Sequence, residues 1–98
     1  MIVEFHQWFE TNDNWLREKL VGIELKQGSG RLAATTAYVE SKTHLGCITI
    51  WETGALDAHV ASRDNAESVY AERWDLKNAE EMRSVLRDFC EKLAREVF

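Results

Sequence analysis

The sequence predicts an α+β domain: an antiparallel five-stranded meander flanked by an N-terminal and a C-terminal helix. Three observations support this fold class, namely helical periodicity at both ends of the chain, apolar–polar alternation between them, and short links between the strand-like runs. Short links favour antiparallel neighbours, because a parallel pair needs a crossover of about a dozen residues. The 98 residues suffice for one hydrophobic core, so we expect a single domain over residues 1–98.

The first helix is predicted over residues 4–20, where large apolar side chains recur at helical spacing. At about 100° per residue, one face carries Phe5, Trp8, Phe9, Asn12, Trp15, Leu16 and Leu20. Residues 11–14 are polar and rich in helix-capping types, which predicts a kink or a break there. We expect Gly22 to end the helix, since glycine readily adopts the left-handed conformation.

The central hairpin spans residues 44–60 and turns at Glu52-Thr53-Gly54. A three-residue loop closing on Gly54 sorts the paired residues cleanly, because directly opposed side chains share a face of the sheet. One face then carries Ile48, Ile50, Leu56, Ala58 and Val60, and we expect it to form the core. The other face carries Cys47, Thr49, Trp51, Asp57 and His59. A register slip of one residue would exchange the two faces.

The remaining elements follow the same rules. Residues 23–27 alternate as a strand, residues 28–30 form a Gly-Ser-Gly turn, and residues 31–40 are typical of a second strand. A turn over residues 62–67 precedes a fifth strand over residues 68–74, with Tyr70, Glu72 and Trp74 on one side. Asn78 and Glu81 have the spacing of a helix-capping pair. The last helix has one apolar stripe, with Cys90 at its edge: Ala79, Met82, Val85, Leu86, Phe89, Leu93 and Val97.

The net charge of −5 is concentrated in the later strands. Residues 40–75 contain seven acidic and three basic side chains, a local charge of −4. Such a field repels nucleic acid and favours a basic partner, although an acidic surface also simply keeps a protein in solution. No apolar run approaches the roughly 20 residues of a membrane span, and the N-terminus lacks the pattern of a signal peptide. Two distant cysteines favour reduced thiols, so we expect a cytoplasmic protein that does not act at a membrane.

Catalytic and metal-binding patterns are weak in this sequence. Cys47 and His59 are expected to be cross-strand partners, and Asp57 would share their face, which is the only arrangement here that suggests a nucleophile and base. A flat sheet face offers no evident pocket or oxyanion donors, and strands often carry such residues on a wetted side. Zinc-ligand spacing is missing. We therefore expect no enzyme activity, no cofactor and no metal.

A protein-binding surface is the function that these features favour. Trp51, Asp57 and His59 share one predicted face, which Tyr70, Glu72 and Trp74 of the next strand would extend. Aromatic anchors within a charged field are what a protein-binding face needs. The alternative is that Trp51 or Trp74 packs beneath a helix instead. The residues expected to contact a partner are Trp51, Glu52, Asp57, His59, Asp64, Glu67 and Glu72.

The spaced aromatics and the hairpin motif resemble a known family. The segments FHQWFETNDNWLREKL, ITIWETGALDAHV, ESVYAERWDL and NAEEMRSVLRDFCEKL together resemble the Trp-rich TriTu immunity proteins, which are encoded beside bacterial polymorphic toxins. The motif W-E-x-G-x-x-D falls on Trp51, Glu52, Gly54 and Asp57. The resemblance implies a cytosolic inhibitor that binds and neutralises a cognate toxin domain, and it transfers no catalytic residues. An acidic face would suit a basic nuclease toxin.

Two further functions stay open at this stage. A small acidic chaperone of the secretion type, also α+β and usually dimeric, would hold an unfolded segment of an effector. An enzyme that uses Cys47 ranks third. A homodimer is compatible with any of the three functions.

Overall fold

The structure, a computed structural model, describes residues 1–28 and 34–98. Ser29, Gly30 and residues 31–33, which belong to the predicted turn and second strand, lie outside the described residues. Within the described residues, three helices and five strands occur in the predicted order, with the N-terminal helix divided in two: α1 (Ile2–Thr11), α2 (Asp13–Lys19), β1 (Gly22–Gln27), β2 (Ala34–Glu40), β3 (His44–Trp51), β4 (Ala55–Ser62), β5 (Ser68–Asp75) and α3 (Ala79–Arg95). The strands form one antiparallel sheet in the order β1-β2-β3-β4-β5, which confirms the predicted α+β meander.

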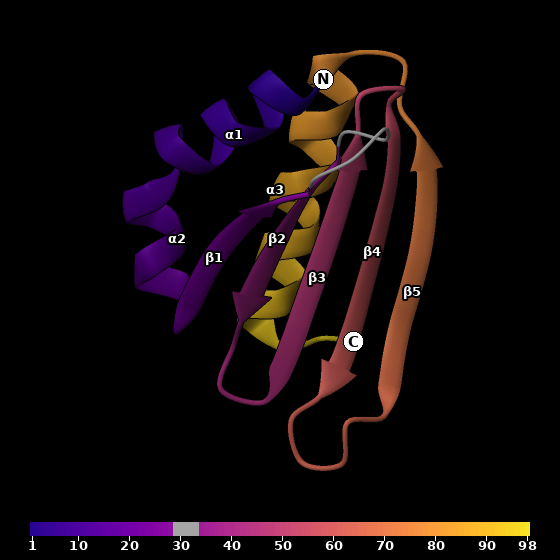
Figure 1. Cartoon of the computed structure of the whole chain (residues 1–98). Coiled ribbons are helices and arrows are strands. Elements are labelled where there is room, and N and C mark those ends of the chain that lie inside the picture. Colours follow the sequence, from indigo (N-terminus) through magenta and orange to yellow (C-terminus); the bar gives the residue numbers. More distant parts are fainter. Residues whose placement is uncertain (29–33) are drawn as a thin grey trace.

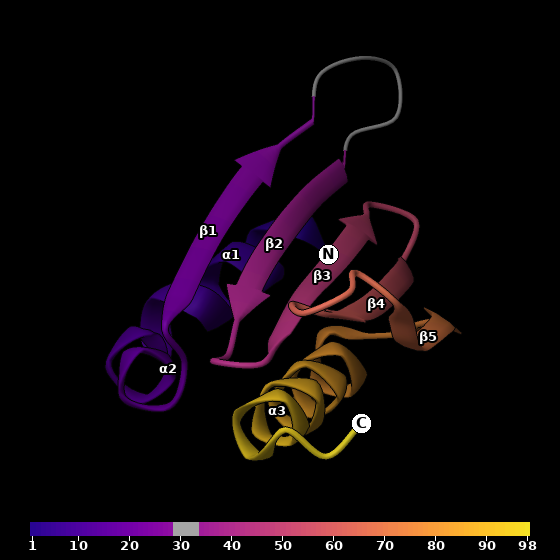
Figure 2. The same cartoon turned by 90° about the horizontal axis from the view of Figure 1, so that it is seen from below.

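All three helices lie on the same side of the sheet (Figures 1 and 2). The hydrophobic core fills the space between this helix layer and the sheet. From the sheet it takes alternate residues, which include Ala37, Val39, Ile48, Ile50, Leu56, Ala58 and Val60. Period-two alternation along the strands thus produces one dry face and one face turned away from the helices.

The central hairpin has the predicted register. Ile50 pairs with Leu56, Ile48 with Ala58 and Gly46 with Val60. The turn closes with a hydrogen bond of 3.0 Å from Gly54 N to Trp51 O. Gly54 has a φ of 95°, a backbone conformation that residues other than glycine rarely adopt. A Cβ on Gly54 would lie 2.4 Å from the carbonyl oxygen of Leu76, so backbone contact also requires glycine here.

The predicted break in the N-terminal helix is confirmed at Asn12. This residue leaves helical geometry at φ −101° and ψ 14°, and its side-chain amide donates a hydrogen bond of 2.8 Å to the carbonyl oxygen of Trp8. The prediction that Gly22 ends the helix was wrong. The helix ends at Lys19, Leu20 is already extended at φ −120°, and Gly22 is the first residue of β1. Leu20 is buried and extended, so the chain enters the sheet without a left-handed residue.

Helix α3 begins as predicted. The Asn78 side chain accepts a hydrogen bond of 2.9 Å from Glu81 N, and the Glu81 carboxylate accepts one of 3.0 Å from Lys77 N. Cys90, at the edge of the predicted stripe, is buried with it. One detail of the stripe was wrong: Val97 is 60% exposed, because the helix stops at Arg95 and Glu96 turns left-handed at φ 57°.

The facing of β5 differs from the prediction. Tyr70, Glu72 and Trp74 pair with Val60, Ala58 and Leu56, all on the core face, so they lie on the helix side and do not extend the face of Trp51. Tyr70 and Trp74 pack against the core cluster. Because these residues face the core, the rings of Tyr70 and Trp74 are partly shielded from water. The exposed Glu72 carboxylate accepts a hydrogen bond from the Tyr70 hydroxyl.

Candidate binding face

The face of the sheet turned away from the helices is the candidate functional site, and we call it the open face. Trp51, Asp57 and His59 do share it, as predicted from the hairpin register. Figure 2 shows that none of the helices in the described part of the chain covers this side of the sheet. Its side chains come from all five strands and include Glu24, Lys26, Thr36, Tyr38, Glu40, Leu45, Cys47, Thr49, Trp51, Asp57, His59 and Arg73.

Trp51 and Trp74 have opposite placements. Trp51 is the last residue of β3, is half-buried, and does not belong to the core cluster or to the side chains packed against it. Trp74 is also half-buried, but it packs against the core on the helix side. Of the two alternatives left open by the sequence, packing beneath a helix therefore applies to Trp74, while Trp51 stays on the open face.

Asp57 forms an ion pair with Arg73 across the β4–β5 boundary. The Arg73 guanidinium donates two hydrogen bonds to the carboxylate, at 2.5 Å from Nε and 2.9 Å from Nη2. These hydrogen bonds hold the pKa of Asp57 below its usual 3.8. Arg73 therefore neutralises the charge of Asp57, and the surface presents a planar, doubly hydrogen-bonded ion pair instead of a free carboxylate.

His59 and Cys47 stand opposite each other, as predicted, but among the described residues the imidazole forms its hydrogen bond with Ser68 and not with the thiol. The exposed His59 ring shares a hydrogen bond of 2.9 Å with the Ser68 hydroxyl, through Nε2. Burial raises the pKa of the Cys47 thiol, an effect that a hydrogen bond with Thr49 partly offsets. A thiol with a raised pKa is mostly protonated near neutrality and is a weak nucleophile. Asp57 is held by Arg73 and does not orient the imidazole.

Over residues 1–28 and 34–98, no three His, Cys, Asp or Glu side chains lie close enough to hold a metal ion together. Both cysteines are free thiols. None of the helices in the described part of the chain has the length and apolar character needed to cross a bilayer.

The other four predicted contact residues lie away from the centre of the open face. Glu52 sits in the β3–β4 turn and points to the start of α1, where it accepts hydrogen bonds from Met1 N at 2.8 Å and Ile2 N at 3.2 Å. Asp64 and Glu67 are exposed in the loop between β4 and β5, at the opposite end of the strands from Trp51. Glu72 lies on the helix side.

Ion pairs reduce the negative charge of the open face. Besides Asp57, the carboxylate of Glu40 contacts Arg63 at 2.8 Å, and that of Glu24 lies 3.9 Å from Lys26. Among the residues that the structure describes, the acids of residues 40–75 that have no ion pair are Asp64, Glu67, Glu72 and Asp75. The unbalanced negative charge therefore follows β5 and its preceding loop, along one edge of the sheet.

A surface depression of about 390 Å³ adjoins the ion pair. It is lined by Asp57, His59, Ala71 and Arg73 together with Ala58 and Glu72. An interface usually needs such a recess to receive an anchoring side chain of its partner. This one combines a carboxylate, an imidazole and a guanidinium, so it suits a polar or charged anchor.

Tyr38 and Arg73 are among the residues of the open face that sequence reasoning missed. Tyr38 is 42% exposed and lies beside Cys47, and a Lys26 ammonium sits 5.7 Å from the centre of its ring. Arg73 provides the cation of the ion pair. Alternation along residues 34–40 already places Tyr38 on the side of Thr36, so that signal was present. Arg73 was obscured because β5 was assigned the opposite facing.

The fold and this face define a class: a small α+β protein with helices on one side of a meander and a wetted, aromatic surface on the other. A family comparison gives the finer assignment. The chain belongs to the TriTu immunity protein family, whose model, described as immunity protein TriTu, matches residues 3–92. The match extends over the whole sheet and most of α3, and it confirms the resemblance seen in the sequence. A comparison with curated proteins finds no match.

Proposed function

We propose that this protein is a cytosolic immunity protein that binds and neutralises a basic toxin domain, a nuclease for instance, through its open face. Membership of an immunity family supports the general role and implies a toxin partner. The observation that carries the proposal for this face is the position of Trp51, whose place in the register puts it on the side of the sheet opposite the core residues and outside the core cluster. A large aromatic left at a sheet surface is a natural anchor for a partner.

Charge distribution supports a basic partner. The acids without ion pairs, including Asp64, Glu67 and Asp75, lie along β5 and its preceding loop, beside the open face. Their field would attract a positively charged domain over several ångströms and orient it before contact. At contact, the Asp57–Arg73 ion pair and His59 would provide hydrogen-bonding groups around the Trp51 anchor.

The test is co-expression and co-purification with the toxin domain encoded by the adjacent gene. We expect a stable complex and protection of the host cell. Trp51→Ala should weaken the complex by roughly 30-fold, the loss typical of a central aromatic contact. Val3→Ala is the matched control, because Val3 is 65% exposed on α1, on the other layer. No complex with the unaltered chain would refute the function, whereas equal affinities of the two variants would refute only the assignment to this face.

A secretion-type chaperone is the second candidate, and the outer edge of β5 favours it. Six of the eight residues of this edge strand are exposed, so an extended segment could add to the sheet there. Size-exclusion chromatography with light scattering separates the two functions. A stable dimer that binds an unfolded peptide and not a folded toxin domain would establish the chaperone. We expect a complex with the folded domain.

An enzyme that uses Cys47 is tested separately. Cys47→Ala should protect the host cell to the extent that it keeps toxin binding, because the raised pKa leaves the thiol a poor nucleophile. Complete loss of protection in this variant, with toxin binding unchanged, would contradict a role as a simple binding protein.

A further inference from the structure

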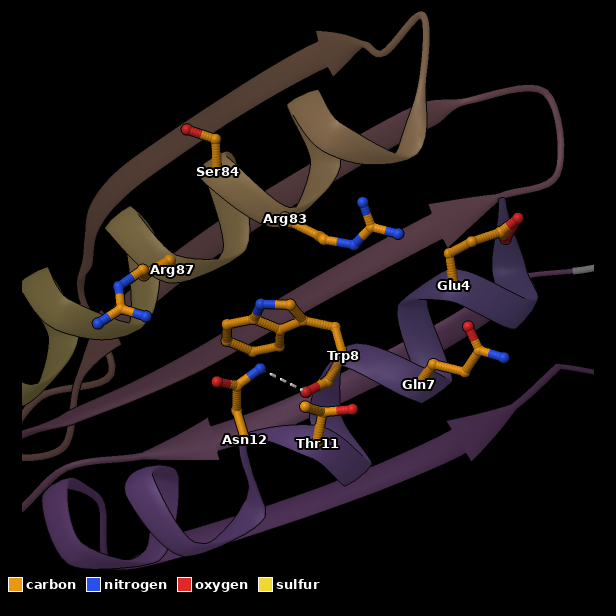
Figure 3. Close-up of a pocket in the computed structure, with 8 residues that line it drawn as sticks. All are labelled: Glu4, Gln7, Trp8, Thr11, Asn12, Arg83, Ser84 and Arg87. Atoms are coloured by element: carbon orange, nitrogen blue, oxygen red, sulfur yellow. Dashed lines mark hydrogen bonds between the residues drawn. The ribbon is translucent and has the colours of Figure 1, made fainter.

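A second recess lies on the opposite side of the molecule, between α1 and α3. Figure 3 shows this groove, which encloses about 460 Å³. Trp8 of α1 forms its floor, with Glu4 and Asn12 on the same wall. Arg83, Ser84 and Arg87 project from α3 on the other wall. The groove belongs to the helix layer and shares no residue with the open face.

The indole N–H of Trp8 has no partner in the described residues. Trp8 is only 7% exposed, and its ring packs edge-on against Phe9 at a centroid distance of 5.0 Å. In Figure 3 the indole nitrogen lies on the ring edge that faces α3. Within residues 1–28 and 34–98, the side-chain amide of Asn12 donates a hydrogen bond to the backbone carbonyl oxygen of Trp8. This bond does not involve the indole nitrogen. The indole nitrogen is not among the fully buried, unpartnered atoms of the described residues, so its N–H is open to the groove and free to donate to an acceptor supplied from outside.

Arg83 supplies a positive charge on the same groove. In the part of the chain that the structure describes, its guanidinium forms no ion pair, and it lies beyond ion-pair distance of the Glu4 carboxylate. Arg87, one turn further along α3, already has partners within the protein. Its guanidinium forms an ion pair with Glu91 at 3.3 Å and lies 5.1 Å from the ring centre of Trp15. Three groups of the groove are therefore available to a ligand: the Arg83 guanidinium, the Trp8 indole N–H and the Ser84 hydroxyl.

We propose that the groove between α1 and α3 binds an aspartate or glutamate side chain of a protein partner. A carboxylate accepts two hydrogen bonds from an arginine fork and can accept a third from the Trp8 N–H. Its single negative charge matches the one uncommitted guanidinium, and Glu4 repels a singly charged carboxylate less than a doubly charged phosphate. The groove is also far larger than an inorganic ion and has an aromatic floor, as an interface pocket for a side chain has.

The test follows the Trp8 indole signal in ¹H–¹⁵N NMR spectra of the full chain, with Trp8→Phe identifying the peak among the four tryptophans. The probes are a blocked tetraglutamate peptide, its tetraglutamine counterpart and inorganic phosphate. We expect the glutamate peptide alone to shift this peak. A peak that stays in place, or one that shifts equally with the glutamine peptide or with phosphate, would overturn the proposal.

Variants assign the effect to the groove. Arg83→Gln should weaken binding of the glutamate peptide by about tenfold or more, because the charge-assisted hydrogen bonds are lost. Arg95→Gln removes the same charge from α3 outside this groove and should leave the affinity unchanged. Glu4→Gln should strengthen binding, since it removes the only acidic side chain found among the described lining residues. Equal losses in the two arginine variants would show a nonspecific charge effect and refute the site.

Discussion

Gly54 shows how one backbone position fixes two parts of the structure. It closes the β3–β4 turn, and its carbonyl oxygen also accepts a hydrogen bond of 2.9 Å from Leu76 N. The hairpin that carries Trp51 is thereby joined to the segment that leads from β5 into α3. A side chain at position 54 would oppose both contacts.

Gly54→Ala should lower the free energy of unfolding by roughly 2–3 kcal/mol, because alanine is strained at positive φ and its Cβ would meet the Leu76 carbonyl. Urea unfolding followed by circular dichroism measures the loss. Thr53→Ala is the control in the same turn and should have a small effect, since Thr53 is exposed. Equal unfolding midpoints for the two variants would contradict the role of Gly54.

The pKa of Asp57 reports directly on the ion pair of the open face. Its pKa is lowered in the folded protein, so the pair stabilises the fold above pH 3.8, and this contribution is lost as the pH falls through the lowered value. Arg73→Gln should return the pKa of Asp57 towards 3.8 in an NMR titration of its carboxyl carbon. Arg63→Gln, which removes the partner of Glu40, should leave it unchanged. An unaltered pKa of Asp57 in Arg73→Gln would refute the pairing.

At the level of elements, helix α3 depends on its first turn for a defined start. The Asn78 side chain satisfies Glu81 N, and the Glu81 carboxylate satisfies Lys77 N, so two backbone donors that no helical carbonyl can reach find partners. This start places Met82, Leu86 and Phe89 over the sheet.

Asn78→Ala should reduce the free energy of unfolding by about 1 kcal/mol, the usual effect of losing such a cap. Asn14→Ala makes the same change at an exposed position within α2 and serves as the control. We expect a lower midpoint of thermal unfolding for Asn78→Ala alone. Indistinguishable midpoints would mean that packing of α3, and not its cap, fixes the start of the helix.

Sequence patterns predicted some elements better than others, for physical reasons. The hairpin register followed from Gly54 and from two clean stripes of side chains, and the cap of α3 followed from the spacing of Asn78 and Glu81. The facing of β5 could not be predicted, because both of its stripes mix apolar and polar residues and a register shift occurs between Val60 and Ala61. The groove on the helix layer was also unpredictable, since it depends on how α1 and α3 approach each other.

At the scale of the whole molecule, the segregation of all helices to one layer separates two roles for tryptophan. Trp74 stabilises the contact between the sheet and the helix layer, whereas Trp51 lies outside that contact. Mutations at the two positions should therefore affect different properties of the protein.

Trp74→Ala should lower the free energy of unfolding by about 2 kcal/mol, because it removes a half-buried ring from the core boundary. Trp51→Ala should lower it by about 1 kcal/mol or less, since it loses only contacts with neighbouring strands. Chemical denaturation of both variants provides the comparison. A Trp51→Ala variant that unfolds as readily as Trp74→Ala would show that Trp51 serves the fold and would remove the argument for an anchor.

The two cysteines have an experimental use that follows from their positions. Cys90 lies in the core, where burial raises its pKa to about 12, while Cys47 stands half-buried in the middle of the open face. Under mildly alkaline conditions an alkylating reagent should therefore modify the native protein at one thiol alone. The rate of Cys47 alkylation would therefore report where a partner binds. A macromolecule bound to the open face would slow this alkylation, and one bound to the helices would not.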